Sequence, residues 1–282
     1  MRRLVIALSI ALLLSWSNRV GAQSFFSDDN ETAVSPASPA SVATTGIFSR
    51  FALGADFSPL GIGATITTNL NPHMNLRANG SFFNYATSFS TDGFTANGSL
   101  KLASARTSLD VYPFHRGFRI SPGVMLYNQN RLTASDTVAS GTSFTLNGDT
   151  FYSANANAAT GATPISGAAL LNLHTSRPAF TITGGWGNPL AHGGHWSFPF
   201  EAGVGFVGAP SLNASLTGWA CYDQAQTQCT NVTNLNNPIA AQVQSDLQSQ
   251  ISKWTQDLNP LRTYPIISGG VTYSFSLGAG RR

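Results

Sequence analysis

The feature that most constrains this chain is a period-two alternation of apolar and more polar residues. It is clearest in residues 195–208, HWSFPFEAGVGFVG. One face of this stretch would carry Trp196, Phe198, Phe200, Ala202, Val204 and Phe206, and the other Ser197, Pro199, Glu201, Gly203, Gly205 and Val207. Such alternation is typical of a β-strand with unlike faces. The apolar face must meet either a protein core or lipid.

The composition of the chain favours lipid. Hydrophobic residues make up 42% of the sequence, whereas charged residues make up only 10%, against about 25% in soluble domains. After the N-terminus, no apolar run is long enough for a membrane-spanning helix, which needs about 18 residues or more. Only helices and closed barrels satisfy the backbone within a bilayer. The composition therefore favours a transmembrane β-barrel.

Seven further segments alternate in the same way, which predicts an all-β fold with eight antiparallel strands. These segments are residues 50–57, 62–68, 76–83, 102–111, 118–127, 180–186 and 266–275. The short links NLNPHMN, YPFHRGF and GNPLAHGGH fall at one end of the barrel, and the longer segments 88–96, 133–167 and 213–261 fall at the other. Bacterial outer-membrane barrels show this asymmetry, with the short turns in the periplasm. The tight link SPLG leaves open a single bent strand in place of the first two, which would change the strand count.

A soluble β-sandwich would also alternate, but it would carry Lys and Glu on its outer faces. The whole chain has only Lys101, Lys253, Glu31 and Glu201, and none of them lies on a predicted apolar face. Trp186, Trp196, Tyr273 and Phe275 lie near predicted strand ends. Aromatic girdles occupy these levels in membrane barrels. We therefore expect the apolar faces to contact lipid.

The N-terminal 22 residues have the pattern of a cleaved signal peptide, with two arginines, an apolar run and small residues before the cleavage site. Residues 23–45 are rich in Ser, Ala and Pro and predict a disordered linker, which leaves residues 46–282 for the barrel. Without the leader the chain has 12 basic and 12 acidic residues, so no nucleic-acid partner is indicated. In an exported chain, the neighbouring Cys221 and Cys229 predict a disulfide, with two free thiols as the alternative.

One segment has helical rather than strand periodicity. It begins with Asn237 as an N-cap and Pro238 in the first turn. Apolar residues then recur every three or four positions, at Ile239, Val243, Leu247, Ile251, Trp254 and Leu258. This amphipathic helix lies in the last long loop, where it is expected to cap its own barrel. The alternative is a lid or a partner-docking helix.

Three blocks of sequence resemble a known group of proteins. They are SLDVYPFHRGFRISPGVMLYNQNRLTA, GGWGNPLAHGGHWSFPFEAGVGFVGAPSLNASLTG and LRTYPIISGGVTYSF. They are similar to conserved blocks of Gram-negative outer-membrane β-barrel proteins without a common function, and more distantly to OmpW-like and CarO-type barrels. The resemblance implies an outer-membrane location, with membrane lipid and the barrel-assembly machinery as partners. SLGAGRR follows Phe275 here, whereas relatives end on that aromatic residue, so recognition of the last strand by the machinery is not implied.

The sequence predicts no catalytic residues, metal site or cofactor. The five histidines lack a paired carboxylate pattern beside them, and HGGH lacks further ligands. What remains is a set of charges expected to face the lumen: Arg50, Asp56, Arg77, Arg106, Asp110, Arg119, Arg177, Glu201 and Arg262. These charges either form ion pairs that fill a narrow lumen or line a path for small anionic solutes. We expect a non-enzymatic barrel, structural or a small-solute conduit that prefers anions. The alternative is a surface adhesin or docking protein that acts through residues 133–167 and 213–261.

Overall fold

The computed structural model describes residues 46–276, except for residues 92–93, 115–116, 174–177 and 191–193. The described residues belong to one unit, residues 44–282. The expectations for the signal peptide at 1–22 and the linker at 23–45 lie outside the described residues.

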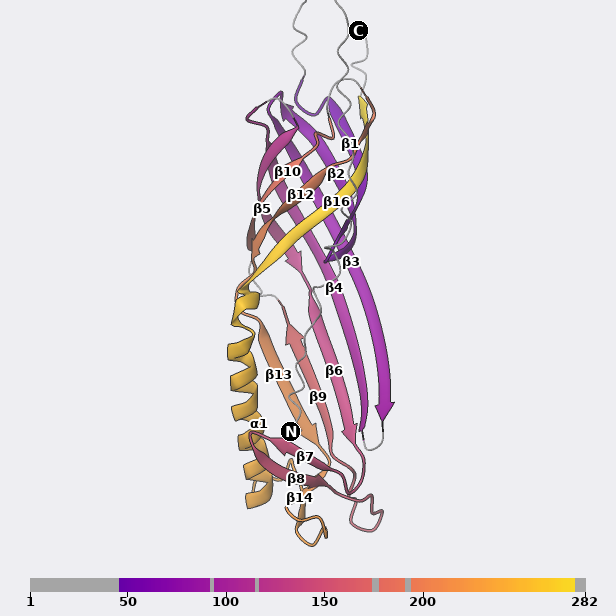
Figure 1. Ribbon diagram of the computed structural model, residues 1–282, viewed down its shortest axis with the longest axis vertical. Helices are drawn as coiled ribbons and strands as arrows, with labels where there is room; N and C mark the ends of the chain where they lie inside the picture. The colour runs from indigo at the N-terminus through magenta and orange to yellow at the C-terminus, as the bar shows by residue number, and fades with distance from the viewer. Residues whose placement is uncertain (1–45, 92–93, 115–116, 174–177, 191–193, 277–282) are drawn as a thin grey trace, which may run out of the picture. The chain divides into compact units, whose positions relative to one another are not determined.

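Eight antiparallel strands close into a ring, in which each strand pairs with the next and the last pairs with the first (Figure 1). The strands are β1 (Arg50–Ser58), β2 (Gly61–Asn71), β3 (Met74–Thr91), β4 (Phe94–Val111), β5 (Phe118–Asn128), β10 (Ala179–Trp186), β12 (Phe200–Phe206) and β16 (Thr263–Ser276). The predicted eight-stranded antiparallel barrel is therefore confirmed.

Two details of the ring depend on Gly and Pro. Ser58 pairs with Gly61 across the SPLG turn, so β1 and β2 are separate strands. Gly61 has φ 113°, and a Cβ there would lie 2.1 Å from the carbonyl oxygen of Phe82, so the turn requires glycine. The seventh predicted strand is interrupted: β11 (Trp196–Ser197) pairs with β16, and β12 begins only after Pro199. Proline has no N–H to donate to the sheet, which explains the break.

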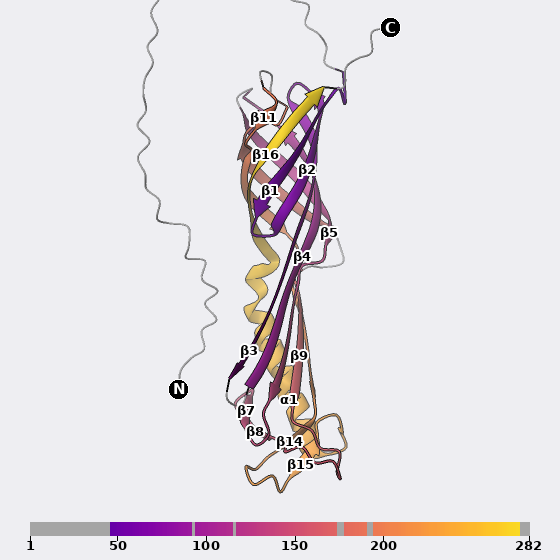
Figure 2. The same ribbon diagram turned by 90° about the vertical axis from the view of Figure 1, so that its right-hand side faces the viewer.

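Strands β3 and β4 have 18 residues each and continue beyond the ring (Figure 2). Here β4 exchanges its neighbour β5 for β6 (Arg131–Val138), which is followed by β9 (Ser166–Asn172) and β13 (Ser211–Thr217). The resulting order β13-β9-β6-β4-β3 is called the extension sheet below. The sequence-based strands stopped short of it, at Phe83 and Leu102.

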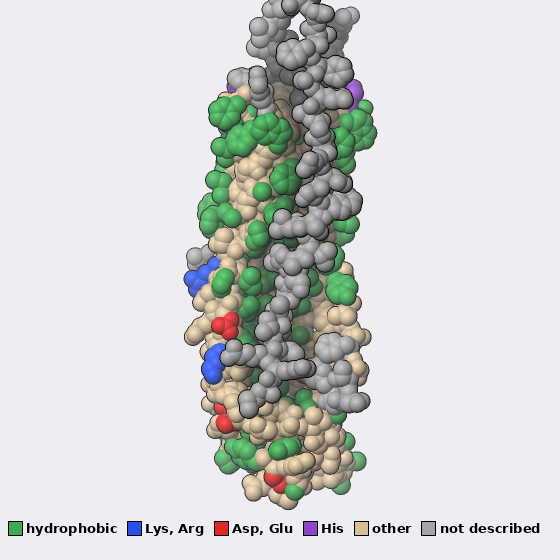
Figure 3. Space-filling view, viewed as in Figure 1, with side chains coloured by type: hydrophobic (Ala, Val, Ile, Leu, Met, Phe, Trp, Pro, Cys, Tyr) green, Lys and Arg blue, Asp and Glu red, His purple; other side chains and the backbone are tan. Residues whose placement is uncertain are grey.

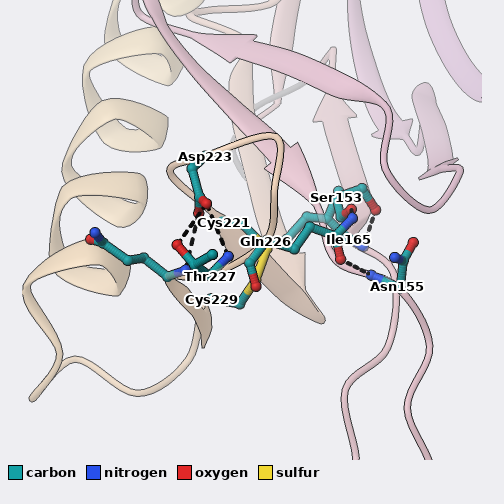
Figure 4. The surroundings of a disulfide bond; sticks show 9 residues. Ser153, Asn155, Ile165, Cys221, Asp223, Gln226, Thr227 and Cys229 are labelled. Atoms are coloured by element: carbon teal, nitrogen blue, oxygen red, sulfur yellow. Dashed lines mark hydrogen bonds between the residues drawn. A yellow bond between two sulfur atoms is a disulfide. The ribbon is translucent and has the colours of Figure 1, made fainter.

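A second, smaller sheet lies next to α1 (Figure 1). This tip sheet consists of β7 (Ser143–Leu146), β8 (Asp149–Ser153), β14 (Trp219–Cys221) and β15 (Cys229–Asn231). A disulfide between Cys221 and Cys229 joins its last two strands (Figure 4). In the loop that the disulfide closes, Asp223 accepts hydrogen bonds from Thr227 and from the backbone of Gln228, and these bonds lower its pKa. The segments 133–167 and 213–261 are thus largely folded, not open loops as expected.

The predicted helix is present as α1 (Pro238–Asp257), and the side chain of Asn237 accepts the N–H of Ile239 at 2.9 Å. Its first half packs into the core of the tip. Val243 lies in a buried cluster with Phe151, Ile165, Ala220 and Val232. The helix contacts β7, β13, β14 and β15 and ends at the 3₁₀ turn η1 (Asn259–Arg262) before β16. The expectation that it caps the barrel is therefore replaced by packing against the extension and tip sheets.

Candidate functional site

The lumen of the barrel is lined by polar and charged side chains. Because side chains alternate along each strand, every second residue of the ring points inward. The buried polar residues at these positions include Asn75, Arg77, Ser81, Ser104, Arg106, Ser108, Asp110, Arg119, Ser121, Thr181, Thr183, Glu201, Thr272 and Ser274. The lumen is therefore a packed polar core. A soluble protein has the reverse arrangement, with apolar side chains inside and polar side chains outside.

Five of these side chains, which we call the lumen network, form buried ion pairs across four strands. Arg77 lies 3.0 Å from Asp110 and 2.6 Å from Glu201. Arg106 pairs with the other carboxylate oxygen of Glu201. Arg119 lies 3.7 Å from Glu201 and 3.8 Å from Asp110. Burial of ions is tolerated only when they are paired in this way.

Hydroxyl and amide groups complete the partners of the acidic side chains. Glu201 also accepts hydrogen bonds from Thr183 at 3.2 Å and Ser268 at 3.1 Å. A third carboxylate, Asp56, accepts hydrogen bonds from Thr65 at 2.9 Å and Asn79 at 2.8 Å. The two cavities beside these residues measure about 20 Å³ each, which is room for about one water molecule. The network therefore fills the middle of the lumen.

The remaining predicted lumen charges are placed differently. Arg50 points inward near the end of the barrel, where it donates to the carbonyl of Leu190 at 2.5 Å. Arg262 is exposed in η1, before β16 begins, and does not lie in the lumen. The expectation that Arg262 faces the lumen is therefore wrong, because β16 begins only at Thr263. Arg177 lies outside the described residues.

The outer face of the ring is apolar (Figure 3). Its exposed side chains include Leu53, Phe57, Ile62, Ile66, Leu76, Phe82, Ile120, Leu126, Phe180, Ile182, Phe200, Phe206 and Ile267. Among the described residues, the outward positions of the ring strands carry no Lys, Arg, Asp or Glu from the turn end of the barrel to the level of Lys101. In the view of Figure 3, the charged side chains lie on the part of the molecule that carries α1. This belt is the surface that the opening alternation predicted.

Aromatic rings gather at the end of the belt where β5 begins and β10 and β16 end. Trp186 packs 6.1 Å from Phe118, and Trp196 packs edge-on against Tyr273 at 5.0 Å between ring centroids. Phe275 stacks on Phe51 at 6.1 Å. The four predicted girdle residues thus lie at one end of the barrel.

Lys101 and Arg131 bound the other end of the belt. They are paired neighbours on β4 and β6, on the outer face where the extension begins. From Val111 to Lys101 a strand tilted by about 40° rises roughly 25 Å, the usual height of the apolar band of a membrane barrel. The belt thus has an aromatic border and a basic border at a bilayer-sized spacing.

No metal-binding cluster is found among the described residues. Within them, no group of three or more His, Cys, Asp or Glu side chains could hold a metal ion. His195 donates through Nδ1 to the carbonyl oxygen of Ser274 (2.8 Å) and stacks on Tyr273, and His73 lies in a turn. Of the helices described, none is long and apolar enough to cross a membrane.

Comparison with known proteins finds similar structures but no similar sequence. No family model and no curated protein matches the chain. The crystal structure of Acinetobacter baumannii CarO2 aligns with a TM-score of 0.49 and 16% identity, over 81% of this chain and 99% of that one. Acinetobacter baumannii CarO aligns with a TM-score of 0.48 and 15% identity, over 79% and 97%. CarO-type barrels are one of the groups that the sequence blocks resemble.

Proposed function

We propose that this chain is an integral β-barrel protein of the bacterial outer membrane and that the closed barrel anchors a working surface outside the membrane. The observation that carries the proposal is the placement of side chains on the ring, which has an uncharged apolar belt outside and paired ions inside. A soluble barrel would expose several hundred Å² of apolar surface without a partner. Membrane lipid is then the partner of the belt, with Lys101 and Arg131 at the level of lipid phosphates.

The lumen network supports an anchor more than an open channel. Each of its acidic side chains has arginine partners within ion-pair distance, and the neighbouring cavities hold about one water molecule each. Most of the strands outside the ring belong to the extension and tip sheets. We place the function, which we propose to be non-enzymatic, in this outer part. This favours the docking alternative raised by the sequence.

Two measurements test this proposal. The mature protein should be insoluble without detergent and should migrate faster on gels before boiling than after it. In planar bilayers the wild-type protein should give no steady current. A protein that stays monomeric and soluble without detergent would refute the membrane anchor, and a stable open conductance would refute the closed lumen.

A small-solute conduit is the second candidate, and the polar lining of the whole lumen favours it. Such a conduit would need the lumen network to rearrange. The inward charges described are four arginines, at 50, 77, 106 and 119, against Asp56, Asp110 and Glu201. This excess of one is smaller than the six-to-three excess expected from the sequence, so any preference for anions should be weak. Reversal potentials across a salt gradient, measured on any current that appears, would give its sign.

A further inference from the structure

The extension sheet has two unlike faces. The register across its strands places side chains in rows that cross the sheet. On the inner face, which continues the lumen face of β3 and β4, one row is Tyr85, Leu100, Leu132, Leu171 and Leu212, and the next is Thr87, Gly98, Ala134, Ala169 and Ala214. The opposite face is rich in Ser, Thr and Asn. An apolar inner face calls for a cover.

Helix α1 covers only part of this face. Its first half is buried in the tip, but Trp254 in its second half remains 43% exposed. Between the helix and the sheet lies a cavity of about 270 Å³, lined by Trp254 and Leu247 of α1, Phe144 and Leu146 of β7, and Leu216 of β13. A larger depression of about 750 Å³ shares Ala134, Ala169 and Ala214 with it, and its lining also includes polar residues from the adjoining rows, such as Ser99, Thr133 and Asn213. We call the two together the inner groove.

One carboxylate lies in this apolar surrounding. Asp136 of β6 lines the cavity, and its neighbours across the sheet on the same face are Ala96 and Gly167, which leave space beside it. Its Oδ1 is shielded from solvent and has no hydrogen-bond partner among the described residues. Burial raises the pKa of Asp136. A buried carboxylate oxygen without a partner costs free energy that a bound donor would recover.

We propose that the inner groove binds an amphiphile that carries a protonated amine, with the amine on Asp136 and the apolar body on the row of small side chains and on Leu216 and Leu247. Trp254 and Phe144 line the same cavity as Asp136 and add apolar surface for the body of the ligand. This inference goes beyond the anchor function and does not depend on it.

The lining also excludes other ligand classes. No Lys, Arg or His lines either part of the groove in the described residues. A fatty acid would bring its carboxylate next to Asp136 without a cation to pair with, and a free amino acid would leave its carboxylate unpaired. A neutral alcohol would fill the apolar rows but could not neutralise Asp136.

Calorimetric titration of the protein in lipid nanodiscs, with empty nanodiscs subtracted, tests the proposal. The probes are hexylamine, hexanol, hexanoate and lysine. Wild type should bind hexylamine most tightly, hexanol more weakly, and hexanoate and lysine not measurably. Asp136→Asn should weaken hexylamine binding at least about tenfold, the value of one hydrogen bond to a charged group, and should change hexanol binding less than twofold.

Three variants keep the test decisive. Asp136→Glu retains the charge and should retain the preference for the amine. Ala169→Leu fills the groove and should weaken both hexylamine and hexanol. Asp149→Asn, an exposed carboxylate outside the lining, should change neither. Equal hexylamine affinity in wild type and Asp136→Asn, or hexanoate binding as tight as hexylamine binding, would overturn the proposal.

Discussion

The lumen and the inner groove are built on the same two strands and have opposite chemistry. The inner face of β3 and β4 carries Arg77, Arg106 and Asp110 within the ring. Farther along, the same face carries Leu100, Gly98 and Ala96. The change comes where β4 leaves β5 for β6, and where β3 loses β2 and becomes an edge.

The difference shows what encloses each space. A narrow closed ring brings side chains from all directions, so ions on β3, β4, β5 and β12 find partners at 2.6–3.8 Å. Opposite the open extension sheet, the described residues place apolar side chains of α1 and β7, so an ion there has few partners. Charges are therefore frequent and paired in the lumen, whereas the groove has a single carboxylate without a described partner. The first arrangement stabilises the fold, and the second leaves binding capacity unused.

The largest effect is expected from breaking the lumen network. Glu201→Ala leaves the buried guanidinium groups of Arg77 and Arg106 without their shared carboxylate. Removing one member of a buried ion pair costs about 3–5 kcal/mol. Urea unfolding in detergent, followed by the gel shift between folded and unfolded barrel, should show this loss. Asp149→Asn in the tip should leave the barrel transition unchanged, and an equal loss in both variants would contradict the difference between the two regions.

A smaller effect is expected from opening the tip. Replacing Cys221 and Cys229 by serine releases a loop with a sequence separation of 8, which corresponds to about 2.5 kcal/mol of chain entropy. Tip unfolding, followed by Trp219 fluorescence, should move to lower urea while the gel shift of the barrel stays in place. If alkylation without reductant labels both thiols of the wild type, the bond is not formed and this expectation fails.

The third prediction compares the loss of stability from substitutions in the first and second halves of α1. Val243→Ala removes a fully buried side chain from the tip core and should cost about 2 kcal/mol, from lost burial and the cavity left behind. Ile251→Ala, on the same stripe but only partly buried, should cost clearly less in the same urea titration. Equal losses would mean that the second half of α1 is anchored as firmly as the first, leaving no accessible groove.

The smallest effect concerns the pH dependence of Asp136. Its pKa is raised by burial, so the folded state binds the proton more tightly than the unfolded state and loses stability as the pH rises through the folded pKa. Asp136→Asn removes this loss. The variant should be more stable than wild type at pH 7, and the gap should shrink as the pH falls toward the ordinary range of an Asp. A gap that stays constant between pH 7 and pH 4 would contradict a raised pKa for Asp136.

The sequence predicted the ring well and the outer part poorly, for a physical reason. In the ring, lipid contact forces large apolar side chains onto every second position, so the pattern stands out. In the extension sheet the apolar face has a leucine row followed by a row of Ala, Gly and Thr, and the other face carries Ser, Thr and Asn. The stretch of β3 beyond Phe83 therefore resembles a loop. The stretch SLNASLT, which forms β13, does alternate, and this alternation could have predicted a strand there. Asp136 gave no signal, because its isolation depends on which strands β6 pairs with.

Ring closure also sets an order of events during biogenesis. The first strand, β1, closes on the last, β16, and residues 83–262, which include the whole extension and tip, lie between them in the sequence. A pairing so distant along the chain is slow to form. Once it forms, the lumen network leaves no passage through which a folded tip could be threaded. With the extension and tip sheets outside the membrane, as proposed, both must cross it before β16 pairs with β1.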